Sequence, residues 1–161
     1  MPSILNWIVG LHSLIRWAIL VLLIINMINS YVEANTPYTK DDIKWNFRLL
    51  IFTHINVLIG LIQYFFGEKG FKYFLDYSVS EVMKSSVMRF WAVEHITGML
   101  IAAVVITITR GVTKKNIPDG AKHKRQAILY TVALIIILIS IPWPFRIPDV
   151  PWFRNLSYMI S

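Results

Sequence analysis

Four histidines, His12, His54, His95 and His123, are the residues of this chain best suited to chemistry. Each of them falls on or beside a different one of four long apolar segments. Histidine is costly in hydrocarbon, and an ionisable residue inside a membrane usually serves a function. One imidazole per segment predicts ligands that reach toward a shared interior, and haem iron is the metal centre that best suits them in a membrane bundle.

The segments that carry these histidines are long enough to cross a lipid bilayer. They run over 4–30, 45–66, 87–109 and 124–141, and a membrane span needs about 20 residues. A backbone in lipid must satisfy its own hydrogen bonds, so we expect each segment to be a helix. The sequence therefore predicts an all-α integral membrane protein, with one transmembrane domain over 1–161 built as an up-down four-helix bundle.

The composition bounds the class of protein. Of the 161 residues, 56% are hydrophobic, and the mean hydropathy is +0.56. The chain has no cysteine, which excludes disulfides, thiolate-bound clusters and covalent c-type haem. The net charge of +7 comes mostly from basic residues at segment ends. This pattern indicates the orientation of the chain in a membrane rather than nucleic-acid binding. The first segment lacks a basic n-region, so we do not expect a cleaved signal peptide.

Mixed aromatic and charged stretches connect and follow the spans. The second loop, 71–86, is expected to form a short interfacial helix that lies on the membrane. The tail from Pro142 onward combines aromatic residues with arginines, which favours the headgroup zone. We interpret this aromatic C-terminal tail as an interfacial anchor, with a docking strap for a partner subunit as the alternative.

The distribution of Lys and Arg predicts the orientation. The loop from Arg110 to Arg125 holds six basic residues against one acid, Asp119, and the first loop adds basic residues on the same side. The positive-inside rule then places the first and third loops in the cytoplasm and both termini outside. In a bacterial inner membrane the termini would be periplasmic.

The depth of each histidine decides which pairs can share a metal. His12 and His95 lie near the outer ends of two parallel helices, so they are expected at similar depth. His54 and His123 belong to the inner tier and are offset by about 10 Å, from a rise of ~1.5 Å per residue. In an up-down bundle these pairs lie on diagonals of roughly 12–14 Å, which suits a porphyrin held edge-on between two imidazoles.

The helix faces leave several alternatives open. His95 shares a face with Gly98 and Ala102, whose small side chains would leave space for a flat macrocycle or simply for close helix packing. His54 points nearly opposite to the polar face of its own helix, which weakens an inner site. His123 lies in a basic interfacial loop, which is its alternative interpretation.

Arg16 and Glu94 are charged residues within the spans, where charges normally pair. An Arg16–Glu94 ion pair is the plain structural interpretation. Alternatively, Arg16 neutralises a haem propionate and Glu94 takes part in proton uptake.

Six short motifs resemble a group of small four-helix bacterial inner-membrane proteins called cytochrome B, loosely compared with cytochrome b561. The matching stretches cover most of the chain and are 12–17 (HSLIRW), His54 with 58–61 (LIGL), 82–86 (VMKSS), 89–95 (RFWAVEH), 121–125 (AKHKR) and 141–146 (IPWPFR). The resemblance implies an integral membrane b-type cytochrome with histidine-bound haem. The larger diheme cytochromes typically place two histidines on each ligand-bearing helix, whereas each helix here has one, so the number of haems stays open.

The first hypothesis is therefore an inner-membrane haem b protein that transfers electrons to or from quinone or a partner subunit. His12 and His95 would bind one haem, His54 and His123 would bind a second if there is one, and Arg16 would assist. Such a protein is an electron carrier rather than an enzyme with its own acid and base. The alternatives are a cofactor-free accessory subunit of a larger membrane complex and, third, a proton or metal transporter. Membrane lipid surrounds the chain in each case, and a homo-oligomer is also compatible.

Overall fold

The computed structural model describes residues 4–147 and 150–151, and its regular structure is helical. The elements in chain order are α1 (Ile4–Val32), α2 (Lys40–Phe66), α3 (Lys72–Asp76), α4 (Val79–Lys84), α5 (Ser86–Arg89), the π-helical turn η1 (Phe90–Glu94), α6 (His95–Val112) and α7 (Asp119–Ser140). The elements α5, η1 and α6 follow one another without a break as one span, Ser86–Val112. Among the described residues, four helices are thus long and apolar enough to cross a membrane, which confirms the predicted all-α architecture.

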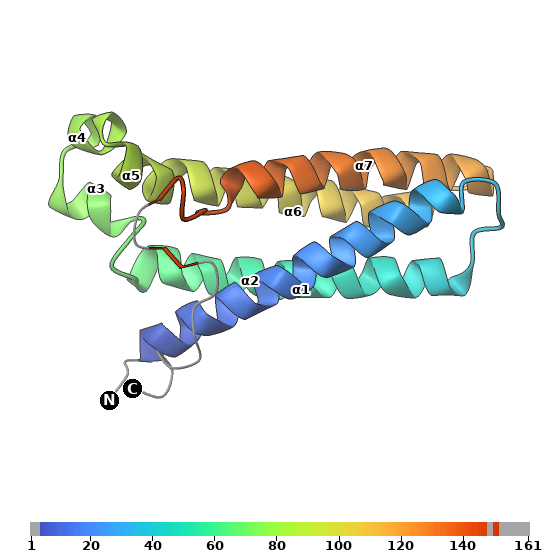
Figure 1. Ribbon diagram of the computed structural model, residues 1–161, viewed down its shortest axis with the longest axis horizontal. Coiled ribbons are helices and arrows are strands. Elements are labelled where there is room, and N and C mark those ends of the chain that lie inside the picture. Colours follow the sequence, from blue (N-terminus) through green and yellow to red (C-terminus); the bar gives the residue numbers. More distant parts are fainter. Residues whose placement is uncertain (1–3, 148–149, 152–161) are drawn as a thin grey trace.

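The four long helices form a bundle with neighbours in up-down order. Helix α1 packs against α2 and α7, and α6 packs against the same two helices, so α1 lies diagonally across from α6. Figure 1 shows α2, α6 and α7 running along the long axis of the molecule, while α1 crosses them obliquely. The short helices α3, α4 and α5 gather at one end. This arrangement confirms the diagonals that the sequence predicts.

Helix α2 begins five residues earlier than predicted because of a local capping motif. The Thr39 hydroxyl accepts hydrogen bonds from the backbone N–H groups of Asp41 and Asp42, at 3.2 and 3.4 Å. In return, Oδ2 of Asp42 accepts from the Thr39 backbone N–H at 2.6 Å. This reciprocal capping box satisfies donors that an uncapped helix would expose, and the two acids favour a helix N-terminus.

The second loop contains two short helices rather than the single one predicted. Helix α3 ends at Asp76, and α4 begins after Ser78, whose hydroxyl accepts from the backbone N–H of Glu81. The side chains of Leu75 and Val79 are exposed on this segment. Apolar groups on a helix pair at the end of the bundle are compatible with the predicted interfacial position.

The core lies between the four long helices. Its buried apolar residues are Ile19, Leu20, Leu23, Leu49, Ala102, Ile106, Tyr130, Ala133, Ile137 and Ile141. A polar contact crosses this core: the Asn46 amide donates to the hydroxyl of Tyr130 at 2.6 Å, and that hydroxyl donates to the Asn26 carbonyl oxygen at 3.5 Å. Large apolar side chains elsewhere on all four helices are exposed, as a bundle surrounded by lipid requires.

The described part of the tail turns back at the end of α7. Trp143 donates from its indole N–H to the Leu138 carbonyl at 2.7 Å, and Arg146 donates to the Ile139 carbonyl. In a continuing helix the Leu138 carbonyl would bond to residue 142, but Pro142 has no N–H. The indole therefore satisfies a carbonyl that the proline leaves free. Most of the predicted aromatic anchor, from Trp152 onward, lies outside the described residues.

Candidate functional site

The rings of His12 and His95 meet inside the bundle. Their centroids are 6.4 Å apart, and their planes make an angle of 74°. His12 comes from the first half of α1, and His95 is the first residue of α6, so the two imidazoles reach across a diagonal. The structure thus brings together the two residues of the predicted outer tier.

A backbone carbonyl fixes the orientation of His95. Its Nδ1 lies 2.7 Å from the carbonyl oxygen of Ser140, the last residue of α7. In a continuing helix this carbonyl would accept from residue 144, but Pro144 has no N–H. Because a carbonyl can only accept, Nδ1 carries the proton and Nε2 is left as the basic nitrogen, which is the usual arrangement of a metal-binding histidine.

The ring of His12 occupies space that a glycine on α2 provides. A Cβ atom at Gly60 would lie 3.1 Å from Cε1 of His12, which is tighter than ordinary contact. The Nδ1 atom of His12 is buried beside the backbone of Asn56 and has no hydrogen-bond partner among the described residues. The ring is therefore positioned by close packing rather than by a well-formed hydrogen bond.

Gly98 serves helix packing rather than leaving space beside His95. A Cβ atom at Gly98 would lie 1.9 Å from Oγ of Ser140 on α7. The expected room for a macrocycle at this position is therefore filled by Ser140, and the packing alternative is correct here. Close contact of small residues is a common way for helices to associate in lipid.

The π-helical turn η1 directly precedes His95, and its last residue, Glu94, joins two arginines. The carboxylate of Glu94 pairs with Nε of Arg89 and with Nη2 of Arg146, each at 2.7 Å. The predicted Arg16–Glu94 ion pair is therefore wrong. A single π-helical turn within an α-helix often marks a functional site, and here the ion pairs connect it to the segment after α7.

Arg16 lies one helical turn from His12 on the same helix. Its guanidinium donates to Oγ of Ser13 at 3.3 Å and lies 5.2 Å from the ring of Trp17. A permanent positive charge thus stays close to the histidine pair, although Glu94 is not its partner.

The other two histidines lie apart from each other. His54 is exposed, with Nδ1 2.9 Å from the Leu50 carbonyl and Nε2 3.4 Å from Oγ1 of Thr107. His123 is almost completely buried, with its ring 5.0 Å from that of Tyr38. No ring contact in the described part of the chain joins His54 to His123, so this arrangement does not assemble the predicted inner tier.

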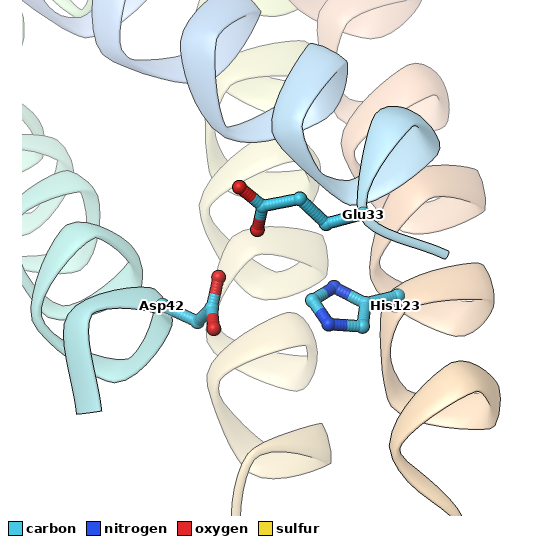
Figure 2. Close-up of side chains that lie close together, drawn as sticks. All are labelled: Glu33, Asp42 and His123. Carbon is cyan, nitrogen blue, oxygen red and sulfur yellow. The ribbon is translucent and has the colours of Figure 1, made fainter. Parts of the chain in front are cut away.

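His123 instead lies beside two acids, Glu33 and Asp42, that the sequence does not mark as site residues. Figure 2 shows its ring pointing from α7 toward the carboxylates of Glu33 and Asp42. The potential ligand atoms of the three residues all lie within 4.8 Å of one another. The sequence indicates this cluster only indirectly, because Glu33, Asp42 and His123 fall in predicted loops on the same predicted side of the membrane.

The pKa values of Glu33 and of the neighbouring Tyr38 are both raised. Burial raises the pKa of Glu33 above its ordinary value, and the neighbouring carboxyl of Asp42 raises it further. Burial also raises the pKa of Tyr38 to about 12, so its hydroxyl stays neutral at physiological pH. The hydroxyl of Tyr38 accepts a hydrogen bond from the Gln126 amide at 3.0 Å.

The fold and these two clusters define a multi-pass, four-helix membrane protein with a pair of half-buried histidines at one end of its described bundle. No family model, curated protein or solved structure matches the chain. The resemblance to the small cytochrome B proteins stays a prediction from the motifs quoted above.

Proposed function

We propose that the chain is a b-type cytochrome of the bacterial inner membrane that holds one haem between His12 and His95 and carries electrons. The observation that supports this most is the spacing of the two rings. Metal–imidazole bonds are about 2.0–2.1 Å long, so two imidazoles on opposite sides of one metal have ring centres about 6 Å apart. The separation of 6.4 Å matches this value.

The donor set also suits haem iron. Both residues offer imidazoles, and the Ser140 carbonyl keeps a proton of His95 on Nδ1, away from the nitrogen that would bind. His12 and His95 would hold the haem, which would supply one-electron redox chemistry rather than oxygen chemistry. An electron carrier, exchanging electrons with quinone or with a partner subunit, is therefore the function favoured over catalysis by acid and base residues.

Neighbouring residues would hold the group and tune its surroundings. The rings of Phe90 and Trp91 lie 5.8 and 5.6 Å from that of His95 and give it apolar neighbours. Arg16 supplies a positive charge one turn from His12, which suits a haem propionate. A second haem at His54 and His123 is not part of the proposal, because the two residues have separate partners.

The proposed orientation keeps the basic third loop in the cytoplasm, which places the histidine pair in the periplasmic half of the bundle. The pair lies near the junction of α5 with α6 and near the end of α7, because His95 begins α6 and contacts the carbonyl of Ser140, the last residue of α7. The electron partner is accordingly expected to dock at the periplasmic side.

A cofactor-free accessory subunit is the second candidate. The hydrogen bond from His95 to Ser140 and the tight Gly98 contact would also serve a bundle that only packs against a larger complex. The two functions differ in a property that is simple to measure, the visible absorption of the purified protein.

The test is a spectrum of the protein purified in mild detergent. An electron carrier should be red, with a Soret band that shifts on reduction by dithionite and one haem per chain by pyridine haemochrome. Replacing either His12 or His95 by Ala should remove the haem, whereas His54→Ala should leave the haem-to-protein ratio at one. A colourless wild-type protein, or haem that persists in both variants, would contradict the proposal and favour the accessory subunit.

A further inference from the structure

The cluster of Glu33, Asp42 and His123 lies at the end of the bundle opposite to the histidine pair. Glu33 directly follows α1, Asp42 is in the first turn of α2, and His123 is near the start of α7. Figure 2 shows the three side chains converging from these three elements. The cluster therefore draws its groups from segments that are distant in the sequence.

His123 carries a buried nitrogen that lacks a partner. The residue is 1% exposed, and its Nε2 has no hydrogen-bond partner among the described residues. A buried polar atom without a partner is costly, and native structures rarely contain one without a reason. Because the ring points toward the two carboxylates, a cation between them would supply the missing partner.

Within the described residues, neither of the two carboxylates is in an ion pair. The ion pairs found in the described residues involve Asp41, Glu68, Glu94 and Asp119, but neither Glu33 nor Asp42. The nearby Lys122 pairs with Asp119 at 3.2 Å. Asp42 uses Oδ2 for the Thr39 cap, so its other oxygen is available to a ligand. Two adjacent carboxylates repel unless a proton or a cation lies between them.

The local backbone holds these donors in place. A Cβ atom at Gly120 would lie 2.8 Å from the Ala34 carbonyl oxygen, so glycine allows α7 to approach the end of α1 closely. This contact brings His123 toward Glu33, while the capping box fixes Asp42. The ring of Tyr38 covers that of His123 at 5.0 Å.

We infer that Glu33, Asp42 and His123 form a binding site for a divalent transition-metal ion. Two carboxylate oxygens and one imidazole nitrogen suit ions of intermediate softness such as Zn²⁺, Mn²⁺ or Fe²⁺, with water in the remaining positions. Bonds of about 2.0–2.2 Å require the donor atoms to draw together from their present spacing, which side-chain rotation achieves. The ion would join α1, α2 and α7 at the proposed cytoplasmic end of the bundle.

The experiment measures Zn²⁺ binding to the full chain in detergent after removal of metals by a chelator. The wild-type protein should bind one Zn²⁺ ion per chain by equilibrium dialysis and elemental analysis. Loss of an outer-shell group costs metal sites about 10–100-fold in affinity, so loss of a direct ligand in Glu33→Gln should cost at least about 100-fold. Asp41→Asn, which removes the neighbouring exposed acid, is the matched control and should bind as the wild type does.

Two further measurements keep the result specific. Asp42→Asn removes a carboxylate ligand and should therefore lose Zn²⁺ affinity. Because asparagine keeps an acceptor for the Thr39 cap, the helical circular dichroism of this variant should stay unchanged. His12→Ala should leave the affinity unchanged, which separates this site from the proposed haem site. If the wild type binds no Zn²⁺, or if Glu33→Gln binds it equally well, the inference is wrong and the two carboxyls share a proton instead.

Discussion

Gly60 shows how one missing side chain positions a histidine. The ring of His12 lies where a larger residue on α2 would project, and its Nδ1 gains no hydrogen bond in the described part of the chain that would hold it there. Close contact with Gly60 therefore helps to set the position of this ring, which is expected to be sensitive to small changes in volume.

We expect Gly60→Val to lower the haem content of the purified protein. The valine methyl groups would extend beyond the Cβ position, already 3.1 Å from the His12 ring, and would push the imidazole out of line with His95. Gly111→Val is the matched control, because a Cβ atom there meets nothing within 4 Å. The measurement is the pyridine haemochrome assay, and equal haem in both variants would contradict this role of Gly60.

The raised pKa of Glu33 gives metal binding a definite pH dependence. The groups facing this carboxyl are Asp42 from α2 and His123 from α7, beside the neutral Tyr38. Without metal, the folded state holds the proton of Glu33 more tightly than the unfolded state does. Its stabilising contribution is then complete below pH 4.5 and is lost as the pH rises through the raised value.

Metal binding should show the opposite trend, because the ion needs the deprotonated carboxylate. Zn²⁺ affinity is thus expected to rise as the pH increases from 4.5 through the raised pKa of Glu33. Isothermal titration calorimetry at a series of pH values checks this, with Asp41→Asn as the control that keeps the trend. An affinity independent of pH across this window would show that Glu33 is not a ligand.

The sequence predicts one of the two candidate sites and misses the other for a physical reason. His12 and His95 could be paired because helix direction and rise fix their relative depth. Glu33 and Asp42 fall in a stretch that the sequence predicts to be a polar loop, where acids are common without any site. The close approach of Gly120 to Ala34 brings Glu33 to His123, the capping box fixes Asp42, and hydropathy reports neither contact.

At the scale of the elements, the four spans follow from apolar length, but their ends depend on local chemistry. The predicted start of α2 is wrong because the capping box of Thr39 and Asp42 extends the helix through a polar, charged stretch. Similarly, α7 begins at Asp119, directly after Pro118, rather than at the first apolar residues. Apolar patterns locate the membrane-embedded part of a helix, whereas caps decide where its hydrogen bonds begin.

The contact between α6 and α7 is expected to be sensitive at Gly98. Gly98→Ala would force its Cβ against Ser140, and overpacking of this kind typically costs about 1–3 kcal/mol. Thermal unfolding in detergent should therefore occur at lower temperature. Adding Ser140→Gly removes both side-chain atoms of that contact and should recover most of the loss. Failure of the double variant to recover would mean that another contact sets the helix spacing.

At the scale of the whole molecule, the absence of cysteine makes the orientation directly testable. Because the chain has no natural cysteine, each of two variants would carry a single thiol. Asn116→Cys places it in the third loop and Ser80→Cys places it in α4, and both positions are exposed. We expect a membrane-impermeant maleimide to label Ser80→Cys in cells whose outer membrane is permeabilised and whose inner membrane is still closed. Asn116→Cys should be labelled only after the inner membrane is opened, and the reverse pattern would invert the proposed topology.

The shared hydroxyl of Tyr130 has a consequence for how the protein meets bilayers of different thickness. Because Asn26, Asn46 and Tyr130 join α1, α2 and α7 inside the bundle, sliding one of these helices by a turn would separate polar groups in hydrocarbon. The helices are therefore held at one relative height. A thinner or thicker membrane has to be accommodated by tilting the bundle as a unit or by deforming the lipid around it.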